Sequence, residues 1–248
     1  MRKHLAVVIF LCLGLTGYSD WQRTVNTPDT QTAGAFNLQI GAEANYVQTG
    51  SGNDNCEDLL GMFRFGLLDN WDVEGKTGVV RFEPDRGNTE IENTDIFIDT
   101  KYRIVDDKPY LPAVALMGGV KVPATDLDSH LGTGETDFRL YALVSKRAGS
   151  AAIAGHVGYV FMGDSDDVDY ANEILMGIEG IYWLRETLNF NLWLDGRRNA
   201  VEETEMWAGA GAKARAGNMF QMFCRFEFGL NEDTTDWDVR VGVDCLVF

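Results

Sequence analysis

One segment of this chain, residues 36–47, alternates apolar and polar side chains for twelve residues without a break. A period of two residues is that of a β-strand with one apolar and one polar face. Strands of globular proteins usually end after about five or six residues, whereas a tilted strand that crosses a bilayer needs about nine to eleven. The segment therefore predicts a strand that is long enough to span a membrane.

The same alternation returns in eleven later segments, so we expect about twelve strands. These segments are 59–68, 71–82, 94–104, 110–122, 136–144, 151–162, 173–183, 188–197, 204–214, 219–230 and 237–248. After the N-terminal leader, the sequence shows no amphipathic helix and no run of about 18 apolar residues. A membrane role would then require a closed barrel, because open strand edges cannot sit in lipid. The expected fold class is all-β, a transmembrane antiparallel up-and-down β-barrel with an even number of strands.

The connections between these segments alternate in length. Short ones cover residues 68–70, 105–109, 146–150, 184–187 and 215–218, and longer acidic ones cover 48–58, 83–93, 123–135, 163–172, 198–203 and 231–236. Short periplasmic turns and longer extracellular loops are typical of outer-membrane barrels. The basic residues Lys146, Arg147, Arg185 and Arg215 then fall on the periplasmic side, and most of the negative charge falls on the outer rim.

Residues 1–19 have the pattern of a secretory signal peptide. A basic start precedes an apolar run over residues 5–15, and the small residues Gly17 and Ser19 stand before the expected cleavage point at Asp20. Residues 20–34 are polar and unpatterned, so they either hang in the periplasm or fold inward as a plug. Residues 35–248 are predicted to form the barrel. The net charge of −17 argues against nucleic acid as a partner.

The polar faces of the predicted strands carry charges of both signs. We expect these side chains and one histidine to line the lumen; the candidates are Glu43, Glu74, Lys76, Asp99, Lys101, Arg103, Lys121, Arg139, His156, Glu179, Asp195, Arg197, Lys213, Arg225, Glu227 and Arg240. The alternative fold is a soluble sandwich or lipocalin-like barrel of about eight strands with an apolar interior. The predicted strands would form a sheet much wider than one apolar core can fill. Ladders of opposite charge fill the interior, leave a narrow aqueous path, or do both.

Aromatic residues at the predicted strand ends are consistent with girdles at two membrane interfaces. They are Tyr46, Trp71, Tyr102, Tyr110, Phe161, Tyr182 and Trp237. The sequence ends on Phe248, as many outer-membrane barrels do. In strict alternation Phe248 is out of phase with Val239, Val241 and Val243, which would require a bulge near the end of the last strand.

Catalysis is not expected, because the sequence shows no constellation of nucleophile, base and orienting group. Of the three histidines, His4 is removed with the signal peptide, His130 sits in a long loop, and His156 lies on a polar or small strand face. No cofactor is predicted. The acidic segment 164–169 could bind calcium, but it lacks a fixed ligand spacing, so a solvated loop and no metal site is the expectation.

The cysteines of the mature chain do not suggest a metal site either. Cys56 lies near a predicted outer loop, and Cys224 and Cys245 lie on neighbouring strands with both side chains expected to face lipid. A disulfide between Cys224 and Cys245 would be possible in an oxidising compartment. Their positions on the paired strands are offset, however, so we do not expect the bond.

Five short motifs stand within residues 122–163: Val122-Pro123, Gly132-Thr133-Gly134, Thr136-Asp137-Phe138, Ser145-Lys146 and Gly158-Tyr159. Together they resemble the MetA-pathway of phenol degradation family of outer-membrane transporters. Residues 66–79 are similar to that family's Gly-Leu-x-Asp-Asn hairpin, and residues 192–199 to its later acidic-glycine strand end. The family's glycine after Pro123 is replaced here by Ala124. The resemblance implies transport of small compounds, aromatic ones among them.

We therefore expect an outer-membrane channel for passive passage of small solutes, a monomer in contact with outer-membrane lipid and lipopolysaccharide. The sequence contains no nucleotide-binding motif of the type GxxxxGKS or GxxxxGKT, so energy coupling is not expected. The alternatives are a structural or adhesive surface barrel without transport and, less favoured, an outer-membrane enzyme. An adhesive barrel would show long loops with hydrophobic or repetitive tips, whereas the predicted loops are moderate and acidic.

Overall fold

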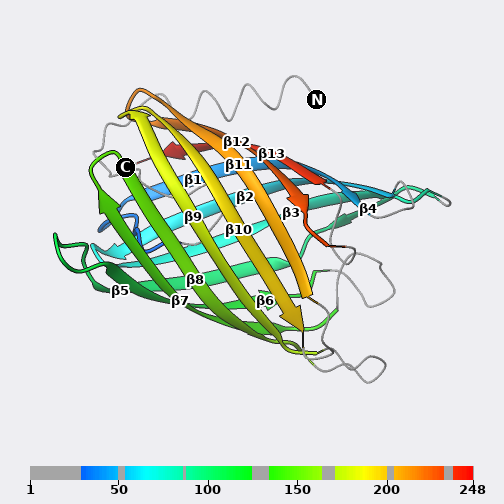
Figure 1. The fold of residues 1–248 in the computed structure, drawn as a ribbon. Helices are drawn as coiled ribbons and strands as arrows, with labels where there is room; N and C mark the ends of the chain where they lie inside the picture. The colour runs from blue at the N-terminus through cyan, green and yellow to red at the C-terminus, as the bar shows by residue number, and fades with distance from the viewer. Residues whose placement is uncertain are drawn as a thin grey trace.

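The computed structural model of this 248-residue chain describes residues 29–49, 54–85, 88–124, 134–163, 171–199, 204–231 and 237–247. These residues form β-strands joined by turns and loops (Figure 1). Among them, no helix has the length and apolar character that a membrane crossing requires. The predicted signal peptide, His130, the acidic segment 164–169 and the terminal Phe248 lie outside the described residues.

The strands of the described chain pair with one another in antiparallel fashion. They are β1 (Leu38–Thr49), β2 (Asp54–Leu68), β3 (Trp71–Glu83), β4 (Glu90–Asn93), β5 (Ile96–Val105), β6 (Ala113–Val122), β7 (Asp137–Ala148), β8 (Ala151–Phe161), β9 (Glu173–Arg185), β10 (Leu188–Asn199), β11 (Thr204–Ala216), β12 (Phe220–Gly229) and β13 (Trp237–Leu246).

The sheet closes on itself because β1 pairs with β13 on one side and with β2 on the other, and β2 pairs in turn with β3. Residues 71–76 of β3 pair with β5, and residues 79–82 pair with β4, so β4 and β5 follow the same edge of β3. The ring therefore has twelve strands, with β4 as a short addition beside it (Figure 1). The predicted closed antiparallel barrel of about twelve strands is confirmed.

Successive side chains of a strand point alternately to the outside and to the interior of a barrel. On β10, Leu192 is 68 % exposed, whereas its neighbours Asn191 and Trp193 are 2 % and 3 % exposed. Phe190 and Leu194 share the outer face with Leu192 and are exposed as well. The predicted phase of this strand is therefore confirmed: its apolar face is the outer one.

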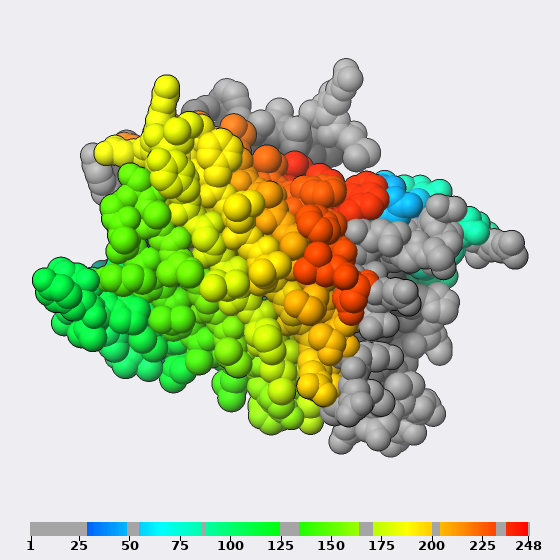
Figure 2. Space-filling view, viewed as in Figure 1, coloured from blue at the N-terminus to red at the C-terminus, as the bar shows by residue number. Residues whose placement is uncertain are grey.

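The outer wall is continuous across β7 to β12 on the face shown in Figure 2. The exposed apolar side chains of these strands include Leu140, Val157, Met176, Ile178, Leu192, Met206 and Phe226. Of the residues predicted for aromatic girdles, Trp71 and Phe161 are exposed at strand ends, and Tyr102 and Tyr182 are exposed three residues before the ends of their strands. A closed barrel with an apolar outer wall suits a bilayer. Its backbone polar groups pair between strands, and its outward side chains are apolar and can contact lipid chains.

Several strand ends differ from the expectation. β1 begins at Leu38 rather than at residue 36, because Phe36 has a φ of 60° and turns the chain away from the extended conformation. β2 begins at Asp54, so most of the loop predicted over 48–58 is strand. The predicted loop 83–93 contains β4. These extensions, at the end of the barrel opposite the short turns, are rich in polar residues on both faces, and alternation therefore gave no signal there.

The described cysteines are free thiols. Cys56 lies within β2, opposite Val47 and Phe82, and not in the loop expected there. Cys224 is exposed, as the prediction of a lipid-facing side chain requires. Its partner residue on β13 is Val241, whereas Cys245 is paired with Phe220. The two cysteines are therefore offset by four residues along the strand pair.

Cys245 stands on the same face of β13 as the exposed Val241 and Val243, but unlike them it is covered by its neighbours. Its side chain is buried, with only 6 % of the residue exposed. Cys245 lies near the end of β13, where it is paired with Ile40 on one side and Phe220 on the other. The larger side chains of these two neighbours flank the small thiol, which accounts for its burial.

Candidate functional site in the barrel interior

Every lumen candidate from the sequence is buried or half-buried. The buried ones are Glu43, Asp99, Lys101, Lys121, Glu179, Lys213, Arg225 and Glu227, and the half-buried ones are Glu74, Lys76, Arg103, Arg139, His156, Asp195, Arg197 and Arg240. Charged groups removed from water are stable only when opposite charges or hydrogen bonds compensate them. The compensating groups come from neighbouring strands, from turns and from the N-terminal segment.

One carboxylate joins three strands where the first and last strands meet. Glu43 of β1 accepts a hydrogen bond from Lys76 Nζ of β3 at 2.6 Å and another from Arg240 of β13 at 3.2 Å. Arg240 also lies 3.4 Å from Asp238, and Arg225 of β12 lies 3.3 Å from the same carboxylate. This series of opposite charges is a cross-strand ladder of the kind that the sequence predicted.

A second ladder crosses β5, β6 and β7. Arg139 of β7 holds Asp99 of β5 in a two-pronged contact, with Nε 2.8 Å from one carboxylate oxygen and Nη2 2.5 Å from the other. Such bidentate pairs fix orientation as well as charge. Lys121 of β6 lies 2.5 Å from Asp137 and 3.5 Å from Asp95. The ladder thus ties three adjacent strands together through the interior.

On β9 to β12 the buried carboxylates accept hydrogen bonds from neutral donors. Asn191 Nδ2 donates to Glu179 at 2.5 Å, and Trp193 Nε1 donates to Glu227 at 2.6 Å. A Cβ atom on Gly209 would lie 2.3 Å from Trp193 Cε2, so the indole occupies space that only glycine leaves open. Trp193 is therefore an interior residue that our candidate set omitted.

Arg197 connects three neighbouring strands from β10. Its Nη2 donates to both carboxylate oxygens of Glu205 on β11, at 2.7 and 2.8 Å, and its Nε lies 3.7 Å from Glu173 on β9. The guanidinium also lies over the Trp207 ring at 6.0 Å from the centroid. Further along β11, Lys213 is buried. Both predicted cations therefore belong to the interior of the same wall.

His156 and Asp195 meet above a glycine on the strand between them. A Cβ atom on Gly177 of β9 would come within 2.5 Å of the His156 ring and within 1.9 Å of the Asp195 carboxylate. The His156 ring also meets the Tyr141 ring edge-on, with 5.9 Å between centroids. Its Nδ1 is buried and has no hydrogen-bond partner within the described part of the chain. His156 is therefore packed as an interior side chain.

The interior also holds apolar side chains that the sequence did not identify. Ala115, Tyr141 and Leu143 are buried together, and Met117 and Leu175 pack against them. We call these five residues the interior apolar cluster. Tyr141 and Leu143 belong to a run in which both faces of β7 are apolar, so polarity could not show which residues point inward. Their shared parity with Arg139 was the available signal.

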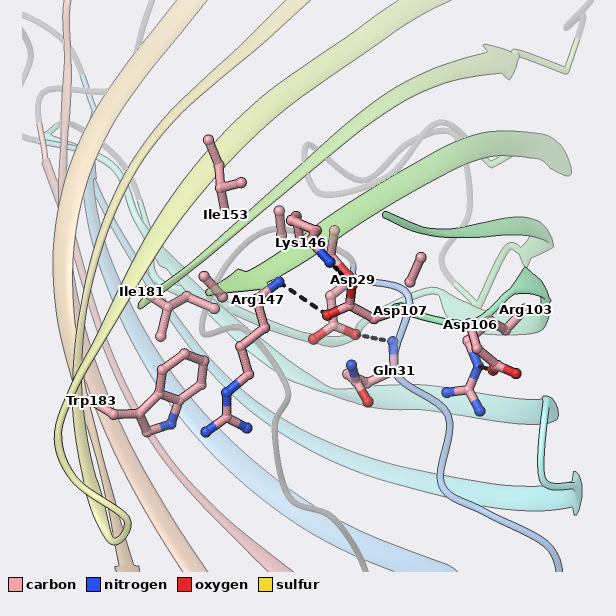
Figure 3. Close-up of a pocket in the computed structure, with 14 residues that line it drawn as sticks. Asp29, Gln31, Arg103, Asp106, Asp107, Lys146, Arg147, Ile153, Ile181 and Trp183 are labelled. Atoms are coloured by element: carbon pink, nitrogen blue, oxygen red, sulfur yellow. Dashed lines mark hydrogen bonds and ion pairs between the residues drawn. The ribbon is translucent and has the colours of Figure 1, made fainter. Parts of the chain in front are cut away.

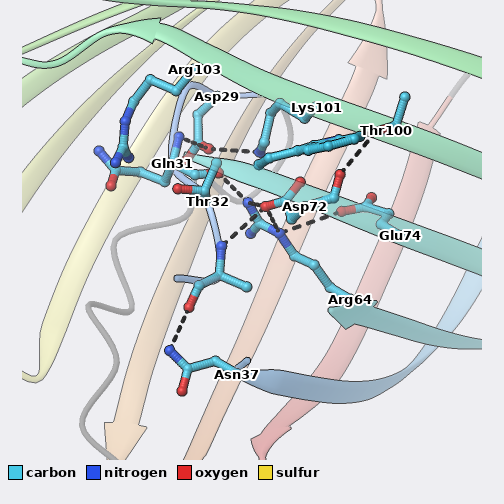
Figure 4. A network of polar contacts seen from close by, with 12 residues as sticks. Asp29, Gln31, Thr32, Asn37, Arg64, Asp72, Glu74, Thr100, Lys101 and Arg103 are labelled. Atoms are coloured by element: carbon cyan, nitrogen blue, oxygen red, sulfur yellow. Dashed lines mark hydrogen bonds and ion pairs between the residues drawn. The ribbon is translucent and has the colours of Figure 1, made fainter. Parts of the chain in front are cut away.

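The described part of the N-terminal segment, residues 29–34, lies inside the barrel (Figure 4). Asp29, Thr30 and Ala33 are all buried. Thr30 Oγ1 shares a hydrogen bond of 2.5 Å with Ser145 Oγ of β7, and Asp29 lies 3.7 Å from Lys101 Nζ of β5. These residues are therefore fixed against the inner wall on two sides.

A buried ion pair holds the middle of this segment (Figure 4). Arg64 of β2 lies 2.6 Å from Asp72 of β3 and donates a hydrogen bond to the Gln31 carbonyl. The same Asp72 carboxylate accepts the Ala33 backbone N–H at 3.0 Å, and Glu74 lies 3.9 Å from Arg64. The pair thus satisfies backbone groups of the segment that would otherwise be buried without partners.

The segment enters at the end of the barrel that carries the short turns. Thr32 Oγ1 donates to the Asp69 carbonyl in the turn between β2 and β3, at 2.6 Å. Arg103 donates to the same carbonyl at 3.1 Å and pairs with Asp106 in the next short turn at 2.9 Å. The sequence assigned these turns to the periplasmic side. It left open whether the segment folds inward, and it missed Arg64, which alternation alone could have placed.

Solved structures share this fold. The COG4313 outer membrane channel from Pseudomonas putida F1 is 12 % identical with a TM-score of 0.74, over 90 % of this chain and 100 % of that one. The KdgM porin in complex with disordered oligogalacturonate is 9 % identical with a TM-score of 0.59, over 84 % and 98 % of the two chains. The CymD monoaromatic hydrocarbon channel is 7 % identical with a TM-score of 0.52, over 86 % and 88 %. At such identities the similarity is one of fold.

No curated protein sequence is significantly similar to this chain. The model of the family described as "Putative MetA-pathway of phenol degradation" matches residues 22–243. The match includes the motifs of residues 122–163 and nearly all of the barrel, so the resemblance seen in the sequence is confirmed. The chain belongs to the MetA-pathway of phenol degradation family.

Proposed function

We propose that this protein is an outer-membrane channel through which small solutes pass without energy coupling. The observation that carries the proposal is the sidedness of the closed barrel. Its outer wall is apolar, whereas its interior holds charged and polar side chains joined across strands. Porins line their water-filled channels with polar and charged side chains of this kind. The solved structures with this fold that are named as channels or porins support the same function.

The proposed path has a mixed lining. The ladders that start at Glu43 and at Asp99 supply charges of both signs, and each charge has a partner nearby. Paired charges limit ion selectivity, because each cation is offset by an anion at the same level. The interior apolar cluster adds a surface on which flat or hydrophobic solutes can make contacts. We therefore propose small solutes, including aromatic ones, as the permeants.

The proposal extends to the organisation of the chain. Residues 1–19 are removed as a signal peptide, residues 20–34 form a plug at the periplasmic end, and the remainder forms the barrel. The contacts of residues 29–34 with Arg64, Asp72 and Lys101 support the plug. The protein acts as a monomer that contacts lipid and lipopolysaccharide through its outer wall. No catalytic role is proposed; within the described residues, the contact found for the His156 ring is with the Tyr141 ring and the His156 Nδ1 has no hydrogen-bond partner.

Vesicles that contain the mature chain, residues 20–248, are expected to swell in small solutes such as a pentose or benzoate and not in a tetrasaccharide. The reason is that buried charged side chains and residues 29–33 occupy part of the interior, so the path that we propose is a narrow one. Swelling is measured by light scattering after mixing with isosmotic solute, with protein-free vesicles as the control. Absence of swelling in every solute would instead support the structural surface barrel.

A further inference from the structure

A cavity of about 320 Å³ lies at the periplasmic end of the barrel, beside the N-terminal segment (Figure 3). Asp29 and Gln31 of the segment form one side, and the turn at Asp106 and Asp107 forms another. The ends of β5, β7 and β9 and the starts of β6 and β8 form the rest of the lining. A space of this size is within the range of sites that bind small organic molecules.

The space exists because small side chains occupy the inward positions around it. Ala113 of β6 and Ala154 of β8 are buried in its wall, and Ala152 lines it one inward position earlier. Ile181 of β9 is also buried there and is followed on the same face by Trp183. One side of the cavity is therefore an apolar surface that ends in a large aromatic ring.

Three cations line or border the cavity, and two of them are matched by carboxylates. Lys146 Nζ lies 2.6 Å from Asp107, and Arg103 Nε lies 2.9 Å from Asp106. The hydrogen bond from Lys146 lowers the pKa of Asp107, which keeps this carboxylate charged and engaged at neutral pH. Neither lysine nor carboxylate is thus available to a ligand without breaking an existing contact.

The third cation, Arg147, is matched differently. Its guanidinium lies over the Trp183 ring, 4.6 Å from the centroid, and its Nε donates to the Gly149 carbonyl at 3.3 Å. Within the described residues it forms no ion pair with a carboxylate. The Trp183 ring holds the guanidinium beside the apolar wall while leaving its outer N–H groups for an acceptor. Figure 3 shows Arg147 and Trp183 together at the edge of the cavity.

We propose that this cavity is a binding site for small aromatic carboxylates. The ligand ring lies against Ile181 and the alanines of β6 and β8, and its carboxylate accepts hydrogen bonds from the guanidinium of Arg147. A guanidinium matches a carboxylate in geometry and charge, and an apolar wall matches the ring. On the proposed solute path, this site is the binding site next to the periplasm. Its role in transport rests on the proposed channel function.

Binding can be measured on the purified mature chain in detergent by isothermal titration calorimetry, with benzoate and its neutral analogue benzyl alcohol as probes. We expect benzoate to bind at least tenfold more tightly than benzyl alcohol. Arg147→Gln removes this preference, because it deletes the charge and leaves a shorter, neutral amide. Arg215→Gln is the matched control, since Arg215 is a basic residue in another short periplasmic turn and bonds the Gly217 carbonyl. It leaves benzoate binding unchanged.

A second variant tests the cavity itself. Ala152→Leu adds volume to the wall and leaves every charge in place, so it weakens both probes by a similar factor. Heat-modifiable gel migration shows that each variant is folded. Equal benzoate affinity in the wild type, Arg147→Gln and Arg215→Gln would overturn the proposal, as would equal affinity for the two probes. If benzoate binding depends on Arg147 but the protein passes no solute, the binding site stands and the channel function is contradicted. If the protein passes solutes but benzoate binding does not depend on Arg147, the channel function stands and the binding site is contradicted.

Discussion

Replacing Leu192 by arginine is expected to destabilise the barrel in lipid by about 2–4 kcal/mol, because the new charge would stand near the middle of a lipid-facing strand. Leu192 is more exposed than Phe190 and Leu194 on the same face of β10, and it lies close to the centre of that strand. A charge at this depth must either lose its hydration or draw water and headgroups into the bilayer. Urea titration of the protein folded into vesicles measures the loss.

The matched control for this substitution is Leu184→Arg. Leu184 is also exposed on the outer face, but it stands at the end of β9 beside Arg185 and a short turn. An arginine at the membrane interface costs only about 0–1 kcal/mol, since its side chain reaches the headgroups. Equal losses of stability for the Leu192 and Leu184 variants would show that Leu192 does not lie near the middle of the bilayer.

Replacing Arg64 by alanine is expected to destabilise the folded chain by about 3–5 kcal/mol, because it leaves a buried carboxylate without its charged partner. The side chains of Arg64 and Asp72 are 4 % and 2 % exposed, and their atoms lie 2.6 Å apart. The substitution also removes the donor to the Gln31 carbonyl, so residues 29–34 lose their central anchor. Denaturant titration gives the stability, and added protease reports release of the segment.

Arg81→Ala provides the comparison for the buried pair. Arg81 contacts Glu57 at 3.0 Å and Glu83 at 2.9 Å, yet all three side chains are largely exposed. Exposed pairs contribute little to stability, because water screens the charges and the side chains lose freedom when they pair. If Arg64→Ala changed stability and protease sensitivity no more than Arg81→Ala does, the ion pair would not anchor the segment.

Alternation fixed which residues face lipid wherever one face of a strand was clearly apolar. In β10 the contrast between Leu192 and Asn191 was enough, and the structure agrees. The same reasoning failed at the adjoining ends of β1 and β2, where polar residues on both faces resembled a loop. It also failed on β7, where Tyr141 and Leu143 point inward from a run that is apolar on both faces. Periodicity shows which residues face lipid only where the outward and inward side chains of a strand differ in polarity.

The partners of the interior charges could not be read from the sequence. Alternation put Asp99 and Lys101 on one face, but it did not show that Asp99 pairs with Arg139 and that Lys101 lies near Asp29. These contacts join residues far apart in the chain, and they depend on barrel closure and strand register. The N-terminal segment posed the same problem, because its placement depends on Arg64 and on other single polar contacts rather than on any repeated pattern.

Single-channel current across a planar lipid bilayer tests the proposed channel most directly. The mature chain is expected to give small, steady current steps. A variant that lacks residues 20–34 is expected to give steps several times larger, because it lacks the segment that we propose as the plug. A barrel that carries Arg81→Ala, with the plug intact, should match the mature chain. If neither the mature chain nor the shortened variant carries current, although both are folded and inserted, the interior is not a path for solutes and the account is wrong.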